Sequence, residues 1–98
     1  MKEITTTELQ AKLENGETVH MIDVREDEEV AEGIIEGAVH IPLGEIPNRM
    51  EELDKQTPYV MICRSGGRSG RATEFLSGNG YNVTNMTGGM LEWSGEVK

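Results

Sequence analysis

The chain is poor in several features that define whole classes of protein. It has one cysteine in 98 residues, so no disulfide can form within the chain, and a reducing intracellular compartment suits it. Its few aromatic residues are one Trp, two Tyr and one Phe, so the core must be built from Val, Ile, Leu and Met. No stretch approaches the roughly 18–20 consecutive apolar residues that a membrane-spanning helix needs.

Basic residues are also scarce, since 9 Lys and Arg stand against 18 Asp and Glu, for a net charge of −9. This charge disfavours nucleic acid and anionic membranes as partners. The segment Met1–Ile4 lacks the apolar stretch of a signal peptide, and we expect a soluble, cytoplasmic protein. The length predicts one domain over residues 1–98.

The few basic residues are not evenly spread. Residues 55–73 contain no acid and carry a charge of +4, from Lys55, Arg64, Arg68 and Arg71, while the rest of the chain carries −13. This basic segment is centred on the single cysteine, Cys63. It would attract a small anion to a protein whose surface is otherwise acidic.

Apolar runs alternate with segments of helical spacing along the whole chain. Strands are predicted over residues 19–24, 38–42, 59–62 and 81–85. Helices are predicted from Thr5 to about residue 14, over 45–54, over about 67–77, and from 87 to 93, with a short helix or turn in the acidic stretch 26–32. This alternation predicts an α/β fold whose central parallel sheet has about five strands, with helices on both faces.

Two helices carry specific local signals. Thr5 and Glu8 form the capping box of the first helix, with Ile4 and Leu9 placed as a hydrophobic staple. In the helix over 67–77, the spacing of Ala72, Phe75 and Leu76 predicts one buried apolar face.

Cys63 stands where the strand 59–62 ends and a glycine-rich turn leads into a helix. A lone cysteine is most often an inert buried side chain. Here, however, turn amides and the positive end of a helix dipole would stabilise a thiolate, and the nearby Arg64 and Arg68 act in the same direction. Ligands of open α/β sheets bind beyond the carboxyl ends of the strands. We therefore predict that Cys63 is a nucleophile.

Four segments, in register along the whole chain, resemble the single-domain rhodaneses. They are Asp23-Val24-Arg25-Glu26, the stretch 33–42 that ends in Ile41-Pro42, the loop Cys63-Arg64-Ser65-Gly66-Gly67-Arg68-Ser69, and Gly88-Gly89-Met90-Leu91-Glu92-Trp93. Two positions depart from the family pattern, because Ile34 stands where His is common and Glu36 where Pro is common. Neither lies in the Cys63 loop, so the departures bear on the local turn and not on the chemistry.

The resemblance implies a sulfurtransferase. The Cys63 thiolate would take the outer sulfur of thiosulfate or a persulfide donor and pass it to cyanide, a thiol or a protein acceptor, in a ping-pong order. It implies a small anionic donor and no cofactor. Neither His20 nor His40 has a ligand spacing with Cys63, so no metal site is expected.

The loop supplies the expected substrate-binding residues, which are Arg64, Ser65, Gly66, Gly67, Arg68 and Ser69. Backbone amides of residues 64–68 would hold the persulfide anion, and the two glycines would let the backbone approach it. We favour Arg64 as the ligand of the donor's sulfonate. Arg68 would then brace the loop against the helix or against Asp23. Ser69 either donates its hydroxyl to the site or caps the helix.

Three further residues have expected structural roles. Asp23 and Arg25, at the end of a neighbouring strand, are predicted to form a supporting ion pair or loop anchor. Trp93 is predicted to plug the core.

The sequence also fits other functions. A phosphatase or arsenate reductase of the cell-cycle type shares the fold, but its loop has five residues between Cys and Arg. Here Arg68 is the fifth residue after Cys63 and Ser69 the sixth, and Ile62, not His, precedes the cysteine. A binding module without turnover, or a carrier that hands its persulfide to a protein partner, also fits the sequence.

Overall fold

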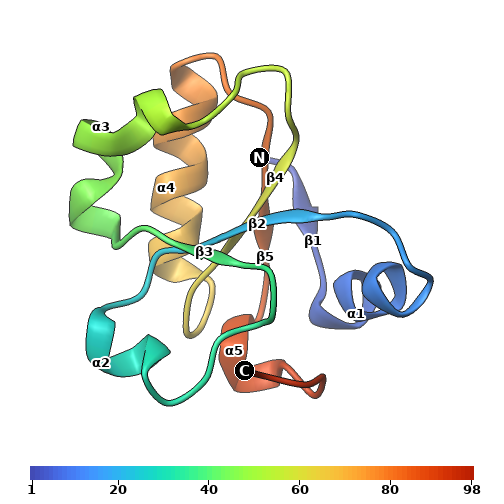
Figure 1. Cartoon of the computed structure of the whole chain (residues 1–98). Helices are drawn as coiled ribbons and strands as arrows, with labels where there is room; N and C mark the ends of the chain where they lie inside the picture. Colours follow the sequence, from blue (N-terminus) through green and yellow to red (C-terminus); the bar gives the residue numbers. More distant parts are fainter.

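A computed structural model describes residues 1–98, and its centre is a five-stranded, all-parallel sheet. The strands lie in the order β1 (Glu3–Ile4), β5 (Val83–Met86), β4 (Tyr59–Ile62), β2 (His20–Asp23) and β3 (Val39–His40). Helices cover both faces (Figure 1). The α/β fold predicted from the sequence is confirmed.

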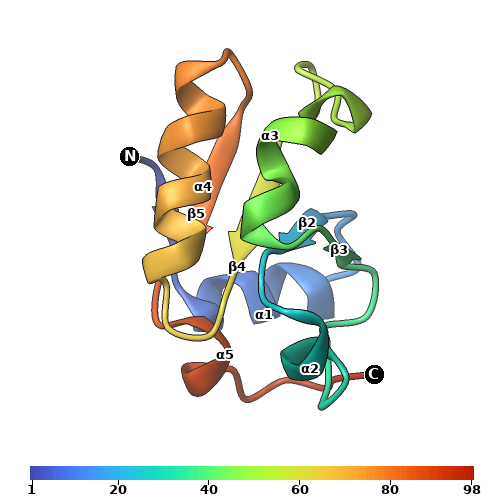
Figure 2. The same cartoon turned by 90° about the vertical axis from the view of Figure 1, so that its left-hand side faces the viewer.

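Each face of the sheet packs against its own set of helices. On one face, α1 (Thr6–Glu14) and α5 (Gly89–Glu92) surround a core cluster that includes Leu9, Val60 and Ile62. On the other face, α3 (Ile46–Arg49) and α4 (Gly67–Gly78) pack over a cluster that includes Met61 and Cys63 (Figure 2). Because successive side chains of a strand point to opposite faces, Cys63 lies on the α4 side of the sheet.

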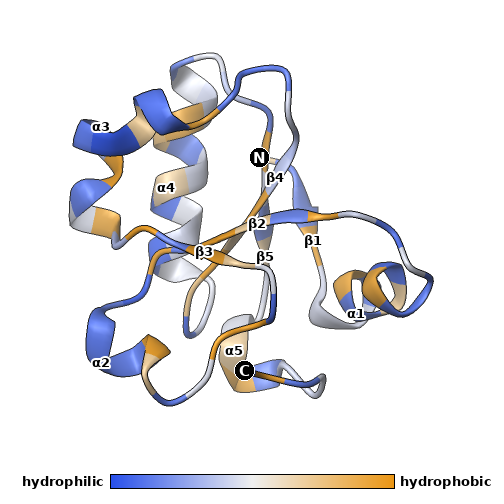
Figure 3. Ribbon diagram, viewed as in Figure 1, coloured by the Kyte–Doolittle hydropathy of each residue, from blue (hydrophilic) through white to orange (hydrophobic).

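The polar exterior is most evident in α2 (Asp27–Val30), a short helix that has no buried residue. Figure 3 shows α2 as largely hydrophilic, whereas β2 and β3 each combine apolar and hydrophilic colour. The helix lies near the carboxyl ends of the strands, close to the loop between β4 and α4 (Figure 1). It therefore belongs to the surroundings of Cys63 and not to the core.

The local signals of the first helix are confirmed, and those of α4 only in part. The Thr5 hydroxyl accepts from the Glu8 N–H at 3.1 Å, and the Glu8 carboxylate accepts from the Thr5 N–H at 2.9 Å. In α4, however, Phe75 is exposed. The buried stripe of that helix consists of Ser69, Gly70, Ala72, Thr73 and Leu76. Counting only apolar residues missed two polar members of the stripe and placed Phe75 on the wrong face.

Several elements differ from the prediction by a few residues at their ends, and two differ more fundamentally. The helix expected over 45–54 is divided into the 3₁₀ turn η1 (Leu43–Glu45), α3 and the 3₁₀ turn η2 (Met50–Glu52). Pro47 lies in the first turn of α3, and a residue without an N–H cannot continue a helix that begins upstream of it. Strand β1 was not predicted, because Glu3 and Ile4 owe their strand geometry to pairing with β5.

Trp93 is half-buried and packs against the core cluster on the α1 face of the sheet, so it covers this core only in part and does not fill it as predicted. Its indole N–H donates to the Glu96 carbonyl at 3.2 Å.

No helix has the combination of length and hydrophobicity required to cross a membrane.

Candidate active site

Cys63 follows β4 directly and is completely shielded, with 0% of its surface exposed. The chain turns back at Gly66, which adopts a φ of +104° and serves as the N-cap of α4. This left-handed conformation favours glycine over every other residue. It brings the Gly66 N–H to 3.0 Å from the Cys63 sulfur, to which it donates.

The surroundings of the thiol act on its pKa in opposite directions. Burial raises the pKa of Cys63, but hydrogen bonds from the Ser69 hydroxyl and from the amides of Ser69, Gly66 and Ser65 lower it, and the lowering prevails. The Ser69 Oγ lies 3.3 Å from Sγ. The loop therefore stabilises a thiolate by donors that point at the sulfur.

Ser69 does not cap α4, because Gly66 occupies that position. The serine is fully buried, and besides Sγ its hydroxyl faces the Oδ1 of Asn85, at 2.5 Å. Asn85 was not among the residues predicted for the site. An available signal was an amide side chain within a predicted buried strand, where asparagine is depleted.

Arg68 was expected to brace the loop against the helix or against Asp23, but it pairs with Glu29, so the Asp23 alternative is wrong. Its Nη1 and Nη2 donate to the two carboxylate oxygens of Glu29 at 2.6 and 2.7 Å. These bonds are the main reason that the pKa of Glu29 falls from 4.5 to about 2. The same carboxylate raises the pKa of Arg68. The pair joins α4 to α2, and Glu29 was not among the residues predicted for the site.

Asp23 and Arg25 form a buried ion pair, with Nη2 of Arg25 at 2.9 Å from Oδ2 of Asp23. The Arg25 backbone N–H also donates to Oδ1 at 3.0 Å. Its guanidinium reaches past the carboxylate to the carbonyl of Gly33 at 2.7 Å. The pair thus fastens the segment after α2 to the end of β2. His40 lies at its edge, 2.6 Å from the Arg25 carbonyl.

The start of α5 holds the other side of the loop. The N–H of Met90 donates to the Cys63 carbonyl, and the N–H of Leu91 donates to the Arg64 carbonyl, both at 2.9 Å. This contact is close because Gly89 has no side chain and has a φ of +61°, and a Cβ there would overlap the Arg64 carbonyl. The glycine pair at the start of α5 therefore permits the loop and the helix to meet.

Arg64 differs from Arg68 in that it is exposed and makes no ion pair. It lines a cleft of about 450 Å³ together with residues of α2, α5 and the C-terminal segment, among them Glu29, Leu91 and Val97. Ser65 and Gly67 are exposed beside it. Of the six predicted loop residues, Ser65, Gly66 and Ser69 donate hydrogen bonds to the thiol. Arg64 and Gly67 are exposed, and Arg68 pairs with Glu29.

A family model for the rhodanese-like domain matches residues 5–96. The chain belongs to the rhodanese-like domain family. A Bacillus subtilis protein named putative sulfurtransferase YtwF is 53% identical over 98 residues, which cover 100% of this chain and 95% of that protein. An Allochromatium vinosum protein named sulfurtransferase is 38% identical, over 96% of this chain and 89% of its own length.

Solved structures also match the fold of this rhodanese-like domain closely. A Staphylococcus saprophyticus protein superposes with a TM-score of 0.96 at 39% identity, over 100% of this chain and 99% of its own. The close agreement covers all the elements that position the Cys63 loop.

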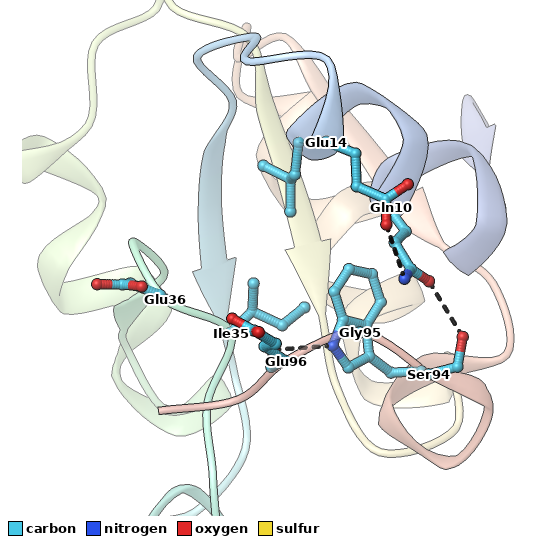
Figure 4. A pocket seen from close by; sticks show the side chains of 9 residues that line it. Gln10, Glu14, Ile35, Glu36, Ser94, Gly95 and Glu96 are labelled. Carbon is cyan, nitrogen blue, oxygen red and sulfur yellow. Dashed lines mark hydrogen bonds between the residues drawn. The ribbon is translucent and has the colours of Figure 1, made fainter.

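The largest cavity of the rhodanese-like domain, about 610 Å³, is separate from the cleft that Arg64 lines. It lies between α1, the Ile35–Glu36 segment and the C-terminal segment around Trp93, and no loop residue lines it (Figure 4). Gln10 bridges its neighbours there, since it donates to Glu14 at 3.3 Å and accepts from Ser94 at 3.0 Å. No cluster of three or more His, Cys, Asp or Glu suited to a metal ion is present.

Proposed function

We propose that this protein is a sulfurtransferase that moves sulfane sulfur through a persulfide on Cys63. The observation that supports this most directly is the environment of Sγ. The sulfur is shielded from water, and the Gly66 N–H at 3.0 Å and the Ser69 hydroxyl at 3.3 Å both point at it. Such an arrangement favours an anionic sulfur and suits a nucleophile that must carry a second sulfur atom.

In the first half-reaction, the Cys63 thiolate attacks the outer sulfur of thiosulfate. An S–S bond forms to Cys63, and the S–S bond of thiosulfate breaks, so that sulfite leaves with its electron pair. The product on the enzyme is a persulfide whose outer sulfur is anionic at neutral pH. Amides of the loop, which already face Sγ, are placed to stabilise that charge.

In the second half-reaction, a thiophilic acceptor attacks the outer sulfur. Its lone pair forms the new bond, and the Cys63 thiolate departs with the electrons of the persulfide bond. Cyanide would give thiocyanate, and a thiol would give a new persulfide. The thiolate is then ready for another donor, which is a ping-pong cycle with no net redox change in the enzyme.

Arg64 is the residue that we propose to bind the sulfonate end of the donor. It lies next to Cys63 in the chain, is exposed, and lines the cleft beside the loop. A guanidinium suits an oxyanion because it offers several N–H donors in one plane. We also propose a cytoplasmic location, because a nucleophilic thiol needs a compartment in which thiols stay reduced.

The arginine geometry favours sulfur transfer over phosphatase chemistry on the same fold. Both Nη atoms of Arg68 are engaged by Glu29, so this side chain is not free to clamp a phosphate over Cys63. A carrier that delivers its persulfide to a protein would use the same first half-reaction and differ only in its acceptor.

Mass spectrometry after incubation with thiosulfate tests the proposal. We expect a gain of one sulfur atom on Cys63, loss of that sulfur when cyanide is added, and neither event in Cys63→Ser. Gain of sulfur without transfer to cyanide would indicate a carrier with a protein acceptor. No gain of sulfur, together with hydrolysis of an aryl phosphate, would overturn the proposal in favour of the phosphatase.

A further inference from the structure

Asn85 contacts the Cys63 loop from the neighbouring strand. In the register of the sheet, Asn85 of β5 stands opposite Met61 of β4, and both lie on the α4 face with Cys63. The Asn85 side chain is buried, with 4% of the residue exposed. Its Nδ2 donates to the Gly66 carbonyl at 3.1 Å, and its Oδ1 faces the Ser69 hydroxyl at 2.5 Å.

The Ser69 hydroxyl therefore has two acceptors and a single proton to donate. One acceptor is the Asn85 Oδ1 at 2.5 Å, and the other is the Cys63 Sγ at 3.3 Å. While the cysteine is a neutral thiol, the amide oxygen is the nearer and the stronger acceptor. Once the cysteine is a thiolate, a charge-assisted hydrogen bond to sulfur becomes the better use of that proton.

We propose that Asn85 is a positioning residue for the nucleophile. Its Oδ1 accepts the hydrogen bond of the Ser69 hydroxyl while Cys63 is a thiol or a persulfide. When Cys63 is a thiolate, the hydroxyl turns and donates its hydrogen bond to Sγ instead. This inference rests on the proposed sulfur transfer for the persulfide half of the cycle. The proton stays covalently bound to the Ser69 oxygen throughout, and only the direction of its hydrogen bond changes.

The exchange has a chemical purpose in each state. A thiolate that is stabilised too strongly is a weaker nucleophile, and Asn85 limits the stabilisation by competing for the Ser69 proton. In the persulfide the negative charge lies on the outer sulfur. The inner sulfur is then a weak acceptor, so the Ser69 hydroxyl again donates its hydrogen bond to Oδ1 of Asn85. The loop amides remain available to donate to the outer sulfur.

The charged groups around the thiol are the Arg68–Glu29 pair, which joins α4 to α2, the Asp23–Arg25 pair at the end of β2, and the exposed Arg64. None of them contacts Asn85 or Ser69 through a hydrogen bond. Substitutions of Asn85 and Ser69 therefore change only uncharged hydrogen-bonding groups and leave the charged side chains around the thiol in place.

A double-mutant cycle isolates the effect, with Asn85→Ala, Ser69→Ala and the double variant. The measurement is the rate of Cys63 alkylation by iodoacetamide as a function of pH, in the absence of any sulfur donor. We compare the effect of Asn85→Ala on the alkylation midpoint with Ser69 present and in the Ser69→Ala background. With Ser69 present, the midpoint should move further to lower pH, by roughly one unit. Equal shifts in the two backgrounds would overturn the proposal, since loss of the Gly66 anchor is common to both.

Nuclear magnetic resonance of the unsubstituted protein gives a second test that needs no change at Asn85. The side-chain carbonyl carbon of Asn85 should change its chemical shift with the midpoint of the Cys63 titration, and Ser69→Ala should abolish that change. A carbonyl signal that does not respond to the Cys63 titration would refute the proton exchange. Both tests follow thiol ionisation alone, so they succeed or fail independently of sulfur transfer.

Discussion

The Arg68 guanidinium and the Glu29 carboxylate form a two-point ion pair, with N–O distances of 2.6 and 2.7 Å. Because this pair holds the far end of the Cys63 loop against α2, the two loop arginines have different surroundings. Arg68 is fixed by a carboxylate, whereas Arg64 is exposed and makes no ion pair.

We predict that Arg64→Ala raises the KM for thiosulfate and lowers kcat/KM by roughly ten- to a hundredfold, as expected for loss of a charge-assisted contact. An alkyl persulfide donor carries no sulfonate group, so its kcat/KM should stay near that of the unsubstituted protein. Arg68→Ala is the matched control, and it should slow both donors alike because it releases the loop. Equal losses for the two donors in Arg64→Ala would contradict the sulfonate assignment.

The Glu29–Arg68 pair should make stability depend on pH in acid. The pKa of Glu29 lies at about 2 in the folded protein against an ordinary 4.5, so the pair stabilises the fold fully above about pH 4.5 and less as the pH falls towards 2. With side chains 27% and 33% exposed, the contribution is about 1 kcal/mol or less.

Chemical unfolding of the unsubstituted protein and Glu29→Gln checks this expectation. The difference in unfolding free energy should be present at pH 6 and shrink between pH 4.5 and 2.5. Glu28→Gln, at an exposed neighbour on α2, should show no such pattern. A difference that stayed constant over this range would argue against the pair as its source.

The Ser69 hydroxyl is predicted to support the thiolate. Ser69→Ala removes a bond that lowers the pKa of Cys63 while burial still raises it, so the pKa should rise. Alkylation and sulfur transfer would then lose rate near neutral pH and recover at higher pH. Ser65→Ala is the control, because Ser65 contributes through its backbone N–H, which alanine keeps. A Ser69→Ala profile that overlays the unsubstituted one would exclude this role.

Gly89→Ala should damage the site from outside the loop. At a φ of +61° the added Cβ is strained and overlaps the Arg64 carbonyl, so the loop or α5 must move. We expect a lower melting temperature and loss of sulfur transfer. Gly78→Ala, at the end of α4 with open space around it, should leave activity unchanged and the melting temperature equal or slightly higher. Normal activity in Gly89→Ala would show that the contact is not needed.

The sequence predicted those parts of the fold that local patterns encode. The run Tyr59–Ile62 forms β4 at the predicted residues, and the capping box of Thr5 and Glu8 is present, because apolar strands and helix caps depend on neighbouring residues. Strand β1 could not be predicted in this way. Its two residues are fixed by pairing with β5, which lies at the other end of the chain.

The same limit applies to the site. The position of Cys63 at the start of a glycine-rich turn is visible in the local sequence, so the residues of the Cys63 loop could be predicted from it. Glu29 is 39 residues from Arg68 and Asn85 is 16 residues from Ser69, so both partnerships depend on how elements meet in space. A charge pattern shows that Arg68 needs a carboxylate, but it does not choose between Asp23 and Glu29.

The complete shielding of the Cys63 sulfur bears on which products a persulfide can give. A nucleophile that attacked the inner sulfur would expel hydrosulfide and leave the enzyme blocked by the acceptor. With that atom enclosed by the loop, the outer sulfur is the site that an incoming molecule meets first. In the proposed persulfide, this shielding would impose regioselectivity, so that sulfur would be handed on and not released as free sulfide.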